Sequence, residues 1–156
     1  MLIRIVHSLT PEEVLERIRG FENQFNSDFE EFEDLFLRKR RPGNLLGIYL
    51  DWARLVDAYR GYEESGELDY IFEEVKEFGL EQLAKLTPKR LALLYQLAGV
   101  RVGSISELAH RVKRDVKNVY DDLLVLSRLG LVVLRRRGLR NIVPETLVEE
   151  ITFLIR

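Results

Sequence analysis

One segment, from Leu86 to Arg140, constrains the fold of this chain more than any other. Thr87-Pro88 is typical of a helix start, because threonine can cap free N–H groups and proline at the first helical position gives up a donor that has no partner there. Gly99 is a helix stop. Between them, apolar residues recur at helical spacing, and we expect these residues to face a core: Leu91, Leu94, Tyr95 and Ala98. The pattern therefore predicts a first helix that ends at Gly99.

Two more helices and a hairpin are predicted after it. Ser104 to Glu107 fits a capping box and starts a short helix, with its inward face on Ile105, Leu108, Ala109 and Val112. A third helix is predicted from about Asp115 to Leu129, and Gly130 ends it. Its inward stripe would be Val116, Val119, Leu123, Leu126 and Leu129. Residues 131–134 and 139–143 then predict two strands around a cationic tip, Arg135-Arg136-Arg137-Gly138.

Charge is distributed unevenly along the chain. The whole chain has a net charge of −2 and an isoelectric point near 5.8. Residues 1–86 carry 11 Lys and Arg against 19 Asp and Glu, whereas residues 87–156 carry 13 against 7. The first part is therefore at −8 and the second at +6. Screening confines electrostatic fields to about 10 Å at moderate salt, so a local basic face matters more for phosphate binding than the global charge.

Several strings in this segment resemble the winged helix-turn-helix regulators common in archaea, in the broad MarR/ArsR-like group. The strings are Leu-Thr-Pro-Lys-Arg (86–90), Ser-Glu-Leu-Ala (106–109), Arg-Asp-Val-Lys-Asn-Val-Tyr-Asp-Asp-Leu (114–123) and Leu-Gly-Leu-Val (129–132). The resemblance covers about residues 86–143, and Arg-Asp-Val-Lys-Asn-Val is its most specific part. It implies a DNA-binding transcription factor, usually a homodimer.

Cationic and amide side chains of this segment are the expected DNA contacts. Lys113 and Arg114 precede the third helix, and Arg114, Lys117 and Asn118 would read base edges in the major groove, since Asn can pair with adenine and Arg or Lys with guanine. The arginines of the hairpin would hold phosphates or a minor groove: Arg135, Arg136, Arg137 and Arg140. Backbone contacts are expected from Lys89, Arg90 and Arg111. One of Asp121 and Asp122 is expected to face the protein and to pair with an arginine.

The first half of the chain predicts a strand at 2–6 and several helices. Thr10 to Glu13 fits a capping box for a helix that stops at Gly20. Four phenylalanines would share one helix face, up to a stop at Pro42-Gly43: Phe25, Phe29, Phe32 and Phe36. Asn44 would cap a helix that carries Trp52 and ends at Gly61, and a further helix is predicted at 67–78. Residues 147–155 fit either a helix or a strand that pairs with 2–6 of the same or another subunit.

Other interpretations of these features compete with site formation. We expect the phenylalanine stripe and the Trp52 face to form core or dimer interface rather than a ligand pocket. The basic run Arg38 to Arg41 fits a solvated helix end, with a phosphate contact as the alternative. The two histidines, His7 and His110, show no metal partner, and His110 fits a surface position. The acidic residues alternate with apolar ones as on solvated helix faces, and the chain has no cysteine, no phosphate loop and no nucleophile elbow.

The sequence thus predicts a mainly α protein with a helical N-terminal region and a C-terminal winged helix-turn-helix with a small β hairpin. Residues 1–85 would serve dimerisation or partner contact, and residues 86–156 would bind double-stranded DNA. We expect a cytoplasmic homodimeric regulator, not an enzyme, with no cofactor, no metal and no membrane association. The alternative is a winged helix that binds another protein and never meets DNA.

Overall fold

The computed structural model describes residues 1–39 and 45–155. Within them the chain forms seven helices and five strands, so the protein is mainly α with small antiparallel sheets, as predicted. The chain divides into two compact units: Met1–Ser8 with Phe72–Arg156, and Leu9–Ile71. This division differs from the predicted boundary at 85/86, because the first strand of the chain belongs to the same unit as its C-terminal half.

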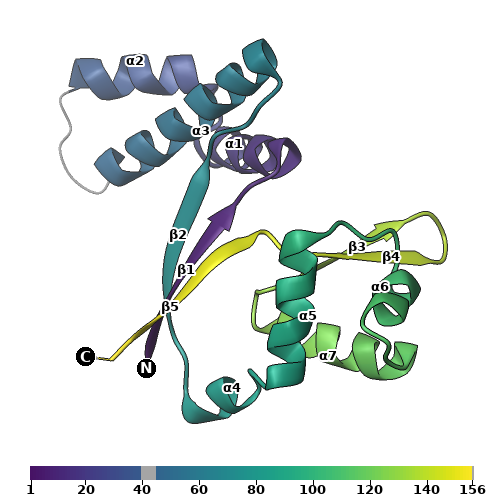
Figure 1. The fold of residues 1–156 in the computed structure, drawn as a ribbon. Helices are drawn as coiled ribbons and strands as arrows, with labels where there is room; N and C mark the ends of the chain where they lie inside the picture. Colours follow the sequence, from purple (N-terminus) through teal and green to yellow (C-terminus); the bar gives the residue numbers. More distant parts are fainter. Residues whose placement is uncertain (40–44, 156) are drawn as a thin grey trace. The chain divides into compact units, whose positions relative to one another are not determined.

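A three-stranded antiparallel sheet in the first unit explains this. Strand β1 (Leu2–Ser8) lies between β2 (Ile71–Glu77) and β5 (Val148–Leu154). Residues 147–155 are therefore mainly strand, and their partner is β1 of the same chain, with Leu2 opposite Leu154 and Ile5 opposite Ile151. On the other side, the backbones of Met1 and Phe78 exchange two hydrogen bonds, of 2.9 and 3.1 Å. The two ends of the chain consequently lie side by side (Figure 1).

The helix predicted at 67–78 is wrong, because Ile71–Glu77 is strand β2. Its apolar residues sit at spacings that a helix and a strand both allow over so short a run. Pairing with β1, which is about seventy residues earlier in the sequence, selects the strand. The side chains of β2 alternate between half-buried and exposed, as expected for a strand with one face on a core.

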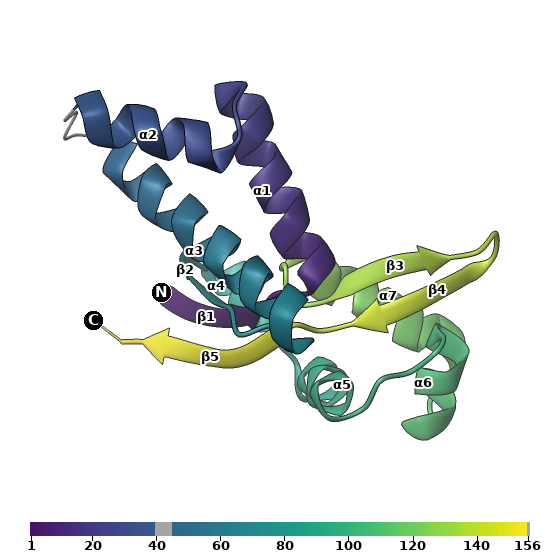
Figure 2. The ribbon, with the colours of Figure 1, turned by 90° about the horizontal axis from the view of Figure 1, so that it is seen from above.

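Three helices and a hairpin follow in the same unit. After a short helix α4 (Leu80–Ala84), which was not predicted, come α5 (Pro88–Gly99), α6 (Ile105–Arg111) and α7 (Val116–Arg128). Strands β3 (Val133–Arg137) and β4 (Asn141–Glu145) then pair as a hairpin that forms an extended arm (Figure 2). This is the predicted order of a winged helix-turn-helix.

One hydrophobic core joins the three helices, the hairpin base and the sheet. It includes Ile3 and Ile5 of β1, which are fully buried, beside Leu108 of α6 and Leu123 of α7. The predicted inward face of α6 is confirmed, since three of its residues are buried and Val112 packs against them. On α7, the inward stripe is confirmed except for Val116, which is 45% exposed.

On α5 the predicted inward face is confirmed for Leu94 and wrong for Leu91, Tyr95 and Ala98, which are exposed. The helix buries Leu93, Leu94 and Leu97, whereas Leu91 is 42% exposed and Tyr95 is 84% exposed. Residues 91–98 are apolar on nearly every side, so the sequence allows two inward faces. Packing against α7 and β4 decides between them.

The second unit consists of α1 (Pro11–Phe25), α2 (Phe29–Lys39) and α3 (Leu45–Ser65). The predicted capping box at Thr10 is present, but α1 continues through Gly20 to Phe25. Asn26 ends it with a left-handed backbone, at φ 51°, and the Asp28 carboxylate accepts from the Glu31 N–H at the start of α2. The predicted stripe of four phenylalanines is therefore split between two helices.

The aromatic residues of this unit pack around Trp52, which is fully buried. The rings of Phe21, Phe29 and Phe32 lie 4.9–5.5 Å from its ring, measured between centroids, and that of Phe25 lies at 6.0 Å. Core formation, one of the two predicted roles of the stripe, is therefore confirmed within a single chain.

The basic run predicted at 38–41 lies only partly within the described residues. Arg38 is exposed and pairs with Asp34 at 2.8 Å, while Arg40 and Arg41, the stop at Pro42-Gly43 and the cap at Asn44 lie outside the described residues.

Among the helices that the structure describes, none combines the length and the apolar character that crossing a membrane requires.

Candidate nucleic-acid interface

The start of α7 is fixed by a cap and by a sharp turn. The Asp115 carboxylate accepts a 3.1 Å hydrogen bond from the Asn118 N–H, which satisfies one of the free donors at the helix start. Lys113 adopts a left-handed backbone, at φ 54°, and so reverses the chain between α6 and α7. The Arg114 N–H donates to the Ala109 carbonyl at 3.0 Å across this turn.

The cap and the turn leave polar side chains in solvent, both in the first turn of α7 and just before it. Lys113, Lys117 and Asn118 are all exposed. Within the described residues, none of their side chains forms an ion pair or a side-chain hydrogen bond with the rest of the protein. Three of the predicted contact residues therefore lie close together along the chain and are free to meet a ligand.

Arg90 and Arg114 are placed differently, because both pair with Asp122 of α7. Arg90 Nε lies 2.9 Å from Asp122 Oδ1, and Arg114 Nη2 lies 2.6 Å from Asp122 Oδ2. The three side chains are only 15–23% exposed. Arg90 also donates to the Lys85 carbonyl at 2.9 Å.

The prediction that one of the two aspartates faces the protein and pairs with an arginine is confirmed for Asp122. Burial favours the neutral acid and would raise the pKa of Asp122, but hydrogen bonds from Arg114 and Arg90 outweigh this effect. The pKa of Asp122 is therefore lowered. The carboxylate holds α5, the turn at 113–114 and α7 together, so Arg114 is occupied in this arrangement rather than extended toward a base.

Helix α6 is capped as the sequence indicates, with one change. Ser104 Oγ accepts from the Glu107 N–H at 3.0 Å, but the Glu107 carboxylate accepts from the Gly103 N–H at 2.7 Å instead of returning to Ser104. This hydrogen bond and a second one from Arg111 lower the pKa of Glu107. Arg111 is thus an exposed cation with a carboxylate partner, 3.1 Å away.

The arginines predicted at the hairpin tip fall within strand β3, and the turn is formed by residues 138–140. Gly138 has φ +76°, and Leu139 next to it is fully exposed. Arg135 pairs with Glu145 of β4 at 2.8 Å, and Arg137 lies 3.6 Å from the same carboxylate while remaining 69% exposed.

Arg136 and Arg140 are the exposed cations of the arm that have no carboxylate partner among the described residues. The arm is also held near its turn, where Asn141, opposite Arg137 in the hairpin, donates from Nδ2 to the Gly103 carbonyl at 2.9 Å. Lys89, in the first turn of α5, is also exposed.

Sequence reasoning missed two properties of this surface. The role of Asp122 as the partner of two arginines depends on Arg90, which is 32 residues away, and only the tertiary fold reveals it. The exposure of Val116 was also missed, because its spacing continues the inward stripe of α7.

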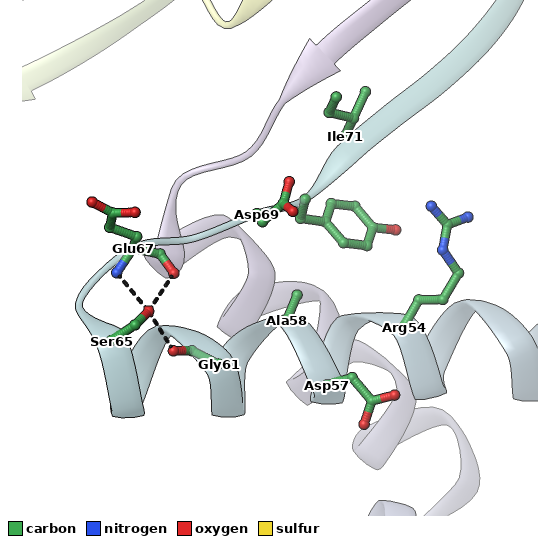
Figure 3. A pocket seen from close by; sticks show the side chains of 9 residues that line it. Arg54, Asp57, Ala58, Gly61, Ser65, Glu67, Asp69 and Ile71 are labelled. Atoms are coloured by element: carbon green, nitrogen blue, oxygen red, sulfur yellow. Dashed lines mark hydrogen bonds between the residues drawn. The ribbon is translucent and has the colours of Figure 1, made fainter.

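The second unit carries a separate hollow of about 620 Å³ at the C-terminal end of α3 (Figure 3). Its wall includes Asp57, Glu67 and Asp69 together with Arg54, whose guanidinium lies 5.5 Å from the centroid of the Tyr70 ring. Ser65 Oγ donates to the Gly61 carbonyl and accepts from the Glu67 N–H. These hydrogen bonds cap the C-terminal end of α3, so the Ser65 hydroxyl and the Gly61 carbonyl already have partners within the protein.

Part of the chain matches a protein-family model. Residues 85–152 match the family model described as HVO_A0114, a description that states no function. No curated protein matches the chain. The matched region runs from the residue before Leu86 through α5, α6, α7 and the hairpin into β5, and therefore contains all the candidate contact residues named above.

Proposed function

We propose that this protein is a sequence-specific, double-stranded DNA-binding transcriptional regulator, similar to the archaeal winged helix-turn-helix regulators of the MarR/ArsR-like group. The observation that carries the proposal is the first turn of α7 together with the turn that precedes it. There Lys113, Lys117 and Asn118 are exposed and unengaged, at the end of a recognition helix that reaches base edges in proteins of this class.

A division of roles among these side chains is part of the proposal. Lys117 and Asn118 would read bases, because lysine can donate to guanine and an asparagine amide can pair with adenine. Arg136 and Arg140 on the arm, with Lys89, would contact phosphates. Arg90 and Arg114, which the sequence predicted as direct contacts, would act through Asp122 by fixing the position of α7.

A homodimer is part of the proposal, and such a regulator would work in the cytoplasm, where the DNA is. One winged helix reads a short site, and two-fold pairing lengthens it. With the phenylalanine stripe largely used inside the chain, other side chains have to supply the interface. Large apolar side chains on α2 and α3 are 48–60% exposed and are available for it: Leu35, Leu37, Leu46 and Leu50.

A winged helix that binds another protein is the second candidate function. It is favoured by the exposed apolar residues Val116 and Tyr120 on α7 and by the carboxylate of Asp121 between them and Asn118. A partner protein could cover this apolar surface, and Asp121 would weaken binding to phosphates.

A binding titration against mixed genomic duplexes separates the two functions. With four to eight phosphate contacts, log affinity should fall against log salt with a slope of about −4 to −7. Absence of binding to any duplex at about 50 mM salt would contradict DNA binding and favour the protein-binding module. Capture of a partner from lysate by the intact protein, lost on Tyr120→Ala, would then support that alternative.

A further inference from the structure

Two apolar side chains form an exposed patch on the flank of α7. Val116 is 45% exposed and Tyr120 is 36% exposed, and residues four apart on a helix are neighbours on its surface. The neighbouring Val119 and Leu123 are fully buried, so the core of the unit is complete without this patch. The patch is therefore not part of the buried core of the unit.

The patch borders the polar residues of the same helix. At about 100° per residue, Val116 and Tyr120 lie along one edge of the exposed face, Lys117 and Asp121 lie along its middle, and Asn118 lies along the other edge. The face thus offers, from one edge to the other, an apolar surface, a cation with an anion, and an amide. A flat hydrophobic partner would have to remove both Lys117 and Asp121 from water, which is costly, whereas a DNA groove places phosphates and water beside Lys117.

An apolar surface on a recognition helix has a specific complement in DNA. Among the groups that base pairs present in the major groove, the 5-methyl group of thymine is apolar, and apolar side chains discriminate it from the polar edges of the other bases. Val116 suits this contact because a β-branched side chain in a helix is held in one preferred rotamer. Tyr120 adds a ring surface one turn further along the helix.

We propose that Val116 and Tyr120 contact the 5-methyl group of thymine in the major groove and so make the protein select A·T base pairs at that position. The inference rests on the proposed DNA-binding function. It names the chemical group that one edge of α7 reads, while Lys117 and Asn118 read the adjoining base edges.

Removal of the methyl group alone tests the proposal. A duplex selected by the full-length protein from a random pool is compared with the same duplex in which deoxyuridine replaces thymidine, at constant salt. Binding should weaken about three- to fivefold for each methyl group contacted, as expected for exposing one buried methyl group. The Val116→Ala and Tyr120→Ala variants should each bind the two duplexes with more similar affinities.

The control variant is Val75→Ala, which truncates an exposed valine on β2, 55% exposed against 45% for Val116, and should keep the full preference for thymidine. Circular dichroism checks that each variant is folded. If Val116→Ala is unfolded, the comparison of the two duplexes is made with Tyr120→Ala alone. Equal affinity of the unchanged protein for both duplexes would overturn this inference while leaving DNA binding intact. Failure to bind any duplex would overturn the proposed function itself.

A third duplex separates the two sources of a 5-methyl pyrimidine. In it, 5-methylcytosine replaces cytosine in the selected site. If this change strengthens binding more than loss of the thymine methyl groups weakens it, methylcytosine is the group that is read, and the assignment to thymine is overturned. If it has little effect, the assignment to thymine is supported.

Discussion

Ile3 on β1 lies directly opposite Phe153 on β5 in an antiparallel ladder that joins the two ends of the chain. The Ile3 side chain is fully buried in the core that α5, α6 and α7 share. The winged helix of this protein is therefore completed by a strand from the beginning of the chain, and its stability depends on residues that sequence reasoning assigned to a different domain.

Truncation of Ile3 should destabilise the first unit. We expect Ile3→Ala to lower the free energy of unfolding by about 2–5 kcal/mol, since it leaves a cavity in a packed core. Chemical denaturation would measure the change. Leu2→Ala is the matched control, because Leu2 is 44% exposed, and it should cost much less. Similar losses for the two variants would contradict the assignment of β1 to this core.

Asp122 should contribute stability that disappears in acid. Its pKa is lowered in the folded protein from an ordinary value near 3.8, so its contribution is present above that pH and is lost as the pH falls through the folded-state pKa. Asp122→Asn should cost on the order of 2–3 kcal/mol at neutral pH, because two largely buried arginines lose their counter-ion.

Denaturation between pH 7 and pH 2 gives the measurement. The difference in unfolding free energy between the unchanged protein and Asp122→Asn should shrink below pH 4. Asp121→Asn is the control, since Asp121 is exposed and makes no ion pair within the part of the chain that the structure describes. A difference that stays constant with pH would exclude an ionic role for Asp122.

Local signals predicted the parts of this fold whose determinants are close in sequence. The caps at Thr10, Thr87 and Ser104 are present where their side chains indicated them. Strand β2 and the buried face of α5 were mispredicted because each segment allows two structures, and a distant partner selects one. The same limit applies to the site: exposure of Lys117 and Asn118 follows from their position on α7, whereas the pairing of Arg90 with Asp122 depends on how α5 and α7 pack.

Asn118→Ala should separate base reading from general binding. It removes an amide that can pair with adenine, so affinity for the preferred site should fall by roughly 1–3 kcal/mol while affinity for unrelated sequences hardly changes. Fluorescence anisotropy on the two duplexes gives both numbers. Ser106→Ala on α6, also an exposed polar side chain, is the control and should leave the discrimination unchanged. Unaltered discrimination by Asn118→Ala would mean that its edge of α7 does not read bases.

The arm should contribute affinity without sequence preference. Replacement of Arg136 and Arg140 by alanine should weaken binding to all duplexes alike and make the salt slope less negative by about 2, since each cation that contacts a phosphate contributes about one unit. The Arg19→Ala, Arg60→Ala double variant changes the net charge equally in the other unit and should leave the slope as it was. A loss confined to one sequence would instead indicate that the arm reads bases.

The exposed leucines of the second unit should mediate dimerisation. Leu46 and Leu50 are 48% and 50% exposed on α3 and, four residues apart, form one apolar strip. Light scattering at micromolar concentration should give about twice the chain mass of 18.3 kDa, and Leu46→Glu with Leu50→Glu should give the single chain, because a buried unpaired carboxylate is costly in an interface. Leu80→Glu, at an 84% exposed position in the other unit, should remain dimeric. A monomeric unchanged protein that still binds DNA tightly would refute the dimer and leave these leucines as a surface for a different partner.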